Sequence, residues 1–290
     1  MRFLGIDLAW GEGTAQRPAN RSGVVALEAD GSISAAGWTI GLDDTLAWIE
    51  REGAGEDALA FVDAPLVIAN AAGQRLCEKQ VGQRYWRFGV SANSTNLASP
   101  RQAGVRLRES LELAGWRYDD GVAGPPSAGR TMSECYPYTT IVGATELRYD
   151  ERPRYKRKPR GMSAVDGWTL RTGECDELIA RVAGLRDADP PIDLCSHATT
   201  RMLVEIPSPR VAAAYKKRED LLDASLCAWT AALWHRQGLA RCDVLGAQDD
   251  PDGDGRRATI IAPSRVSHQV GRTALLLTAD ETSSSVRRGR

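Results

Sequence analysis

The chain has 290 residues, of which 42% are hydrophobic, so it can bury one large core or two modest ones. Its formal charge of −1 provides no global field that would indicate nucleic acid, a membrane or an acidic substrate as a partner. No segment approaches the roughly 20 apolar residues of a membrane span, and the N-terminus does not resemble a signal peptide. The six cysteines form no C-x-x-C pair, which favours reduced thiols. We therefore expect a soluble, cytoplasmic protein with no membrane partner.

The first 67 residues predict a strand order that brings two acids together. The predicted elements are, in order, strands over 2–10, 22–30 and 32–40, a helix over 42–52 and a strand over 58–67. An Asp-Gly dipeptide between the second and third strands favours a hairpin turn. The helical crossover implies that the fourth strand pairs in parallel with an earlier one, and we expect the first. Asp7 and Asp63 would then lie side by side at the sheet end where open α/β sheets bind ligands.

The rest of the chain alternates weaker and stronger signals. We expect helices over 72–80, 101–116, 166–185 and 216–237, a short strand holding Glu134, and two final strands over 242–246 and 258–263. The loop around Trp86 would cover one side of the site. Residues 187–209 are turn-rich and ambiguous. We expect one domain over 1–263, with insertions around 68–130 and 150–210 and a mobile tail over 264–290.

Four separate segments offer acids to one centre. Asp220 and Asp223 lie three residues apart at the head of the predicted helix over 216–237, so they face the same side and repel each other. A divalent cation removes that conflict, and Mg²⁺ prefers oxygen ligands. Two ions about 3.5–4 Å apart can activate a water and stabilise the leaving oxygen of a phosphodiester. The candidate catalytic and metal-binding residues are Asp7, Asp63, Glu134, Asp220 and Asp223, and the expected cofactor is Mg²⁺ or Mn²⁺, as two ions.

Most of these acids also have structural explanations. Asp220 could stabilise a helix start through the helix dipole, Asp63 could form a turn before Ala-Pro, and Glu134 could pair with an arginine. Asp7, on an apolar strand, is harder to explain in this way. The three histidines form no metal-spaced cluster. Because all four segments end in acids under one topology, the metal site is the favoured interpretation.

The segment ERPRYKRKPRG is the sharpest local change in composition. It is either a solvated basic loop or a patch that contacts phosphates, since Lys and Arg that neutralise phosphates supply most sequence-independent affinity for nucleic acid. On the second interpretation the partner is DNA or RNA. The candidate nucleic-acid-binding residues are Arg152, Arg154, Lys156, Arg157, Lys158 and Arg160, together with Lys216 and Lys217.

These motifs resemble those of a bacterial and archaeal family described as predicted RNase H-like nucleases. The resembling pieces span residues 3–263 and are GIDLAW, FVDAPL, ECYPYTT, RYKRKPRG, EDLLDASLCAWTAALW and ATIIAP. The resemblance implies an α/β, RNase H-like fold: a mixed five-stranded sheet, with three antiparallel strands and then parallel strands, flanked by helices. It also marks the same five acids as metal-site residues. Asp7 would bridge both ions, with Asp63 and Asp223 as the other principal ligands and the remaining two as auxiliary ligands.

Three functions remain open at this stage. The first is a metal-dependent nuclease. The second is an actin-like ATPase or kinase relative, whose superfamily also opens on a strand ending in G-x-D. That superfamily normally needs two such domains with a Gly/Thr phosphate loop in each, and only one convincing copy is found here. The third is a non-catalytic scaffold that binds nucleic acid or protein. A homodimer is also possible.

Overall fold

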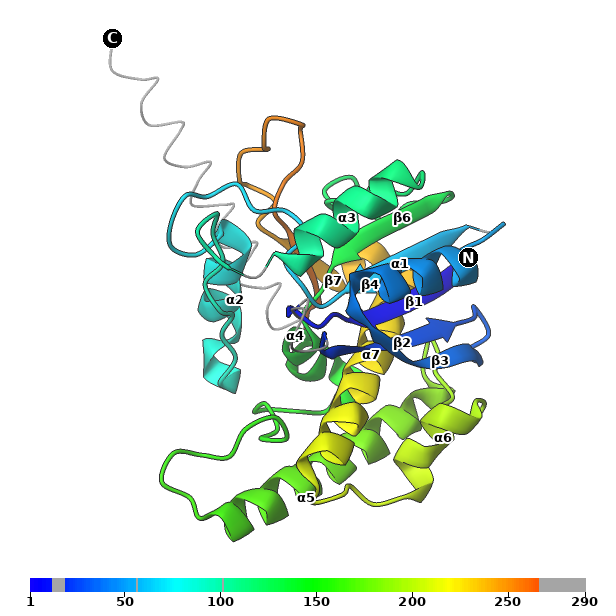
Figure 1. The fold of residues 1–290 in the computed structure, drawn as a ribbon, viewed down its shortest axis with the longest axis vertical. Coiled ribbons are helices and arrows are strands. Elements are labelled where there is room, and N and C mark those ends of the chain that lie inside the picture. The colour runs from blue at the N-terminus through cyan, green and yellow to red at the C-terminus, as the bar shows by residue number, and fades with distance from the viewer. Residues whose placement is uncertain (12–18, 56, 101, 266–290) are drawn as a thin grey trace, which may run out of the picture.

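The computed structural model describes residues 1–11, 19–55, 57–100 and 102–265. These residues form a mixed α/β fold in which helices flank a central sheet (Figure 1). The strands are β1 (Arg2–Asp7), β2 (Arg21–Leu27), β3 (Ile33–Ile40), β4 (Ala58–Val62), β5 (Arg117–Tyr118), β6 (Arg130–Glu134), β7 (Cys242–Leu245) and β8 (Ile260–Pro263). Six of them form one sheet in the order β3-β2-β1-β4-β6-β5, and β7 pairs with β8 separately.

Helices cover both faces of the sheet, with α1 and α3 in front of it and α7 behind it in the view of Figure 1. The helices are α1 (Gly41–Glu52), α2 (Leu76–Tyr85), α3 (Ala103–Leu113), α4 (Pro137–Gly143), α5 (Ala164–Ala183), α6 (Ala198–Glu205) and α7 (Ala212–Gln237). Short 3₁₀ turns lie at Trp86–Phe88, Thr145–Leu147, Gly184–Asp187 and Gly238–Ala240. Within the described part of the chain, no helix combines the length and apolarity that crossing a membrane requires.

The predicted pairing of the first four strands is confirmed. β1 pairs antiparallel with β2, and β2 with β3, through a turn in which Gly31 adopts a φ of +89°. β4 returns through α1 and lies parallel to β1, with Ile6 opposite Val62. The backbone N–H of Asp63 then donates to the carbonyl of Ile6 at 2.8 Å. This parallel pairing places Asp7 and Asp63 at the same end of the sheet, as the sequence predicted.

Several predicted boundaries are wrong. The main sheet has six strands rather than five, because β5 adds two residues beside β6, too few to leave a pattern in the sequence. β4 ends at Val62, earlier than expected, and α2 begins at Leu76 rather than at residue 72. The ambiguous stretch 187–209 contains α6. The predicted tail over 264–290 lies, from residue 266 on, outside the described residues, and the single-domain division stays a prediction.

Helix α7 lies directly on the sheet because two glycines leave room for its backbone. A Cβ atom at Gly5 of β1 would lie 2.0 Å from the carbonyl oxygen of Ala224, and one at Gly23 of β2 would lie 2.1 Å from that of Asp220. Side chains alternate along a strand, so Gly5 and Asp7 face the same side. Every residue of α7 from Arg218 to Trp234 is buried, which confirms the predicted burial of this helix. The close contact carries the acids of α7 to Asp7.

Candidate metal centre and basic cleft

Three acids from three elements form the candidate metal centre, which we define as Asp7, Asp63 and Asp223. Each offers one carboxylate oxygen, and these oxygens all lie within 4.8 Å of one another. Asp7 ends β1 and Asp63 follows β4, and both are partly exposed, whereas Asp223 on α7 is completely buried. An all-carboxylate set of hard oxygen donors at this spacing fits a divalent cation such as Mg²⁺ or Mn²⁺.

Asp220 lies beside this centre, one turn earlier on α7, and is buried. It shares a hydrogen bond with the carboxyl group of Asp7. Its Oδ1 also lies 2.6 Å from the ammonium of Lys216. Asp220 therefore lies next to the three-acid group without belonging to it. The repulsion expected between Asp220 and Asp223 is offset because Lys216 pairs with Asp220 and Lys156 pairs with Asp223.

The basic segment, residues 152–160, supplies both partners of Asp223. The hydroxyl of Tyr155 donates to Oδ1 at 2.6 Å, and the ammonium of Lys156 lies 2.6 Å from Oδ2. The lysine contact is an ion pair without hydrogen-bond geometry, so the buried Oδ2 has no hydrogen-bond partner in the described part of the chain. An oxygen of this kind remains able to bind a cation, which supports the fit of a metal ion here.

Burial and the charges of neighbouring acids raise the pKa values of Asp7 and Asp63. Burial raises the pKa of Asp7 well above its ordinary value, and the charge of Asp223 adds to the rise. Burial likewise raises the pKa of Asp63 to about 7, although Lys156 partly opposes it. Burial alone would lower the pKa of Lys156, but Asp223, Asp63 and Asp7 outweigh this and hold it well above its usual range. The lysine therefore stays charged and, among the described residues, is the cation that pairs with Asp223.

A cleft of about 1220 Å³ opens above the acids. Its floor includes Asp7, Asp63 and Asp220, and its walls include every basic residue proposed from the sequence: Arg152, Arg154, Lys156, Arg157, Lys158, Arg160, Lys216 and Lys217. The loop before α3 contributes Ser91 and Asn93 to one side of the same cleft. Acids and cations that are distant in the sequence thus share one surface.

The basic segment is anchored rather than loosely solvated. Tyr155, in its middle, is completely buried. The carbonyl oxygen of Tyr155 accepts hydrogen bonds from the hydroxyl of Tyr215 at 2.7 Å and from Nε of Arg171 at 3.1 Å. These contacts fix the backbone of the segment, so the cations on either side of Tyr155 form a wall of the cleft.

The family described as "Protein of unknown function (DUF429)" matches residues 5–249. The chain belongs to this family. The DUF429 match includes all five candidate acids and the whole basic segment. No curated protein and no solved structure matches the chain.

In this DUF429 member, Glu134 does not belong to the three-acid group, although it lines a small pocket together with Asp63. It pairs with Val62 and, through Val62, with Ile6, so its side chain faces the side of the sheet opposite to Asp7. There Arg75 donates from Nη1 to Oε2 at 2.8 Å and from Nη2 to Oε1 at 2.6 Å. The structural alternative for Glu134, a pair with an arginine, is therefore the arrangement that is present, and its role as a metal ligand stays a prediction.

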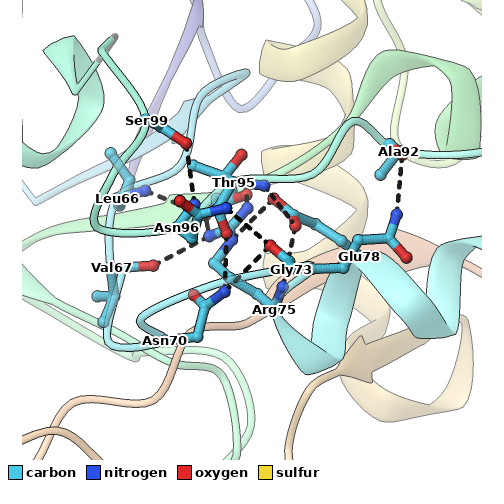
Figure 2. Close-up of polar contacts among 12 residues, drawn as sticks. Leu66, Val67, Asn70, Gly73, Arg75, Glu78, Ala92, Thr95, Asn96 and Ser99 are labelled. Atoms are coloured by element: carbon cyan, nitrogen blue, oxygen red, sulfur yellow. Dashed lines mark hydrogen bonds and ion pairs between the residues drawn. The ribbon is translucent and has the colours of Figure 1, made fainter.

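Arg75 is the centre of a buried polar network (Figure 2). Its Nε donates to Oε1 of Glu78 at 2.9 Å, and its Nη1 also donates to the carbonyl of Val67. Glu78 in turn accepts from the backbone N–H of Thr95, while the amide of Asn70 donates to the carbonyl of Thr95 at 3.0 Å (Figure 2). The network ties the segment after β4 to the loop that borders the cleft.

The sequence did not predict the roles of Tyr155 and Arg75. Tyr155 is an aromatic residue within a run of basic ones, and this pattern could have indicated a buried anchor inside the charged segment. Arg75 gave no such signal, because nothing near it in the sequence indicates that Glu134 is its partner.

Proposed function

We propose that the chain is a divalent-metal-dependent nuclease that hydrolyses phosphodiester bonds of nucleic acid. The observation that carries the proposal is the shared cleft, in which nine cationic side chains, the eight proposed from the sequence and Arg21, surround a floor of carboxylates. Cations at the wall neutralise the phosphates of a bound strand, and the strand would be held over the acids. A purely structural acid cluster would need cations that pair with the acids, as Lys156 and Lys216 do, but not the other cations along the wall.

The strand order and the positions of the acids are also compatible with an RNase H-like fold, which belongs to the same proposal. The sheet begins with three antiparallel strands and continues with parallel ones, and Asp7 and Asp63 lie at the ends of neighbouring parallel strands. Asp223 comes from a long helix packed on β1 and β2. Function does not follow from such a fold alone, so the cleft remains the argument.

The residues that would hold Mg²⁺ or Mn²⁺ are Asp7, Asp63 and Asp223, with Asp220 supporting Asp7 through their shared hydrogen bond. Such ions, proposed as two, would supply an activated water and stabilisation of the leaving oxygen. Because Asp7 and Asp63 have raised pKa values, they must release protons before they can act as ligands. The cationic wall, meanwhile, would attract and position the phosphates of a bound strand.

The decisive test compares wild type with Asp7→Asn on labelled single-stranded, duplex, hybrid and branched substrates. Each would be incubated with Mg²⁺, Mn²⁺ or EDTA. We expect cleavage by wild type only in the presence of metal, and cleavage at background level by Asp7→Asn, because that carboxylate is one of the three in the donor set. Asp250→Asn, which changes an exposed acid outside the cleft, is the matched control and should cleave like wild type.

The other outcomes discriminate between the alternatives. Retained cleavage by Asp7→Asn would contradict the assignment of the centre. Binding of nucleic acid without cleavage, unchanged by EDTA, would favour the non-catalytic scaffold. Binding and hydrolysis of ATP by the purified protein would favour the ATPase or kinase alternative.

A further inference from the structure

Both oxygens of Asp223 are held by two consecutive residues of the basic segment. Tyr155 donates to Oδ1, and Lys156 pairs with Oδ2. The two contacts differ in kind, because Tyr155 is buried and fixed by its neighbours, whereas the side chain of Lys156 is 22% exposed at the cleft. The tyrosine is a permanent support for Asp223, and the lysine is a partner that can leave.

Lys156 occupies the position that a cation would take. Its ammonium lies 2.6 Å from the oxygen that lacks a hydrogen bond, and it is also 5.2 Å from the ring centroid of Tyr138 and 5.7 Å from that of Tyr155. Mg²⁺ binds carboxylate oxygens at about 2.0–2.1 Å. An ammonium 2.6 Å from Oδ2 and an ion bound to the same oxygen would lie close together, and their charges would repel. Metal binding through Asp223 is therefore opposed by Lys156 for as long as its side chain stays in this position.

The cleft offers this side chain another anion. Lys156 lies in the same segment as five other cations that line the cleft, where a phosphate would bind under the proposed function. The backbone at Tyr155 is held by Tyr215 and Arg171, so only the lysine side chain has to turn. A phosphate that attracts the ammonium would release Asp223 for the metal.

We propose that Lys156 is a resident cation of the metal centre, which a divalent ion must displace, and that nucleic acid promotes this displacement. The inference rests on the proposed function and deepens it. Metal and nucleic acid then bind with positive coupling, and by linkage each raises the affinity for the other by the same factor. Free protein would bind metal weakly, and the centre would assemble fully only when a strand is present.

The first measurement is Mn²⁺ affinity by calorimetry without nucleic acid. We expect Lys156→Met to bind Mn²⁺ about ten-fold more tightly than wild type, because the competing ammonium is gone. Lys217→Met removes a positive charge from the same cleft without touching an acid in the described structure, so its affinity should stay within about two-fold of wild type. This control separates competition for Asp223 from a general change in electrostatic potential.

The second measurement is coupling. A short phosphorothioate oligodeoxynucleotide, which resists hydrolysis, should raise the Mn²⁺ affinity of wild type by about five-fold or more and that of Lys156→Met by much less. A thermal melt provides an independent readout, since Mn²⁺ should raise the Tm of Lys156→Met more than that of wild type. If Lys156→Met is unfolded in EDTA, it should fold when Mn²⁺ is added.

Each result decides a different question. Equal or weaker Mn²⁺ binding by Lys156→Met, or a variant that stays unfolded in Mn²⁺, would overturn the role of Lys156 while Mn²⁺ binding by wild type still supports the metal centre. Mn²⁺ binding by neither protein would overturn the metal centre and this inference together.

Discussion

Asp63 and Glu134 stand at the ends of two neighbouring parallel strands, yet the protein surrounds them differently. Glu134 has both oxygens bonded to the buried guanidinium of Arg75 and accepts a further bond from the backbone N–H of Leu66. The side chain of Asp63 has no hydrogen-bond partner within the described residues, and its pKa is raised to about 7, chiefly by burial. We call the Glu134 carboxylate closed, because both of its oxygens are hydrogen-bonded, and the Asp63 carboxylate open, because neither of its oxygens is hydrogen-bonded within the described residues.

The difference teaches which acids hold the structure and which are available for chemistry. A buried arginine that grips a carboxylate with two parallel bonds fixes both groups and leaves little to offer a metal. Lysines that reach the acids from the wall of a cleft, as Lys156 and Lys216 do, balance charge but can be replaced. The test of this view is to remove a partner from each region.

The largest effect is expected at the closed pair. Arg75→Met should lower the free energy of unfolding by about 3–5 kcal/mol, because it leaves Glu134 and Glu78 buried without their cation. Urea denaturation in EDTA measures the loss. Arg154→Met, which removes an exposed pair with Glu151, is the control and should cost less than about 1 kcal/mol.

Arg75→Met with near wild-type stability would show that the network of Figure 2 carries little of the fold. The double variant Arg75→Met/Glu134→Gln removes the buried charge of Glu134 as well as its partner. It should recover part of the free energy of unfolding that Arg75→Met loses.

A smaller effect of opposite sign is expected at the open acid. The pKa of Asp63 is raised from 3.8 to about 7 in the folded protein, so the unfolded chain releases this proton at lower pH than the folded one. Stability from this group therefore falls as pH rises from about 4 to 7 and stays low above that. Asp63→Asn should stabilise the metal-free protein by about 1–2 kcal/mol at pH 8, after allowance for solvent screening, and by almost nothing near pH 4.

Denaturation in EDTA at the two pH values checks this prediction. Glu134→Gln is the matched comparison, because it should destabilise the protein at pH 8 by weakening the pair with Arg75. If Asp63→Asn is instead less stable than wild type at pH 8, the Asp63 carboxylate has stabilising partners, as Glu134 has in Arg75.

The fold and most of the candidate centre could be predicted because they depend on local patterns. Three early strands, the crossover helix and the buried late helix each leave a periodic signal, and G-x-D near the start places Asp7 at a strand end. The glycine two residues before Asp7 faces α7, which explains why a glycine stands there.

The rest depends on register and on distant partners. Glu134 is the last residue of β6, and Asp63 is the first residue after β4. Only the pairing of Val62 with Glu134 shows that the side chain of Glu134 points to the opposite face of the sheet from that of Asp63. A shift of one residue would reverse that outcome, and composition does not determine it. The partners of Asp223 come from a loop 68 and 67 positions away, so no local pattern reveals them.

The smallest effect is expected at the wall of the cleft. Arg157 is exposed and lines the cleft, so Arg157→Met should weaken binding of any sequence alike and lower the slope of log affinity against log salt by about 1. Filter binding or fluorescence anisotropy over a salt series measures the slope. Lys79→Met, which changes an exposed lysine of α2 outside the cleft, is the control. An unchanged slope would remove Arg157 from the interface. Because Arg157 pairs with no acid among the described residues, its loss should leave Mn²⁺ affinity unchanged, whereas the loss of its neighbour Lys156 should raise it.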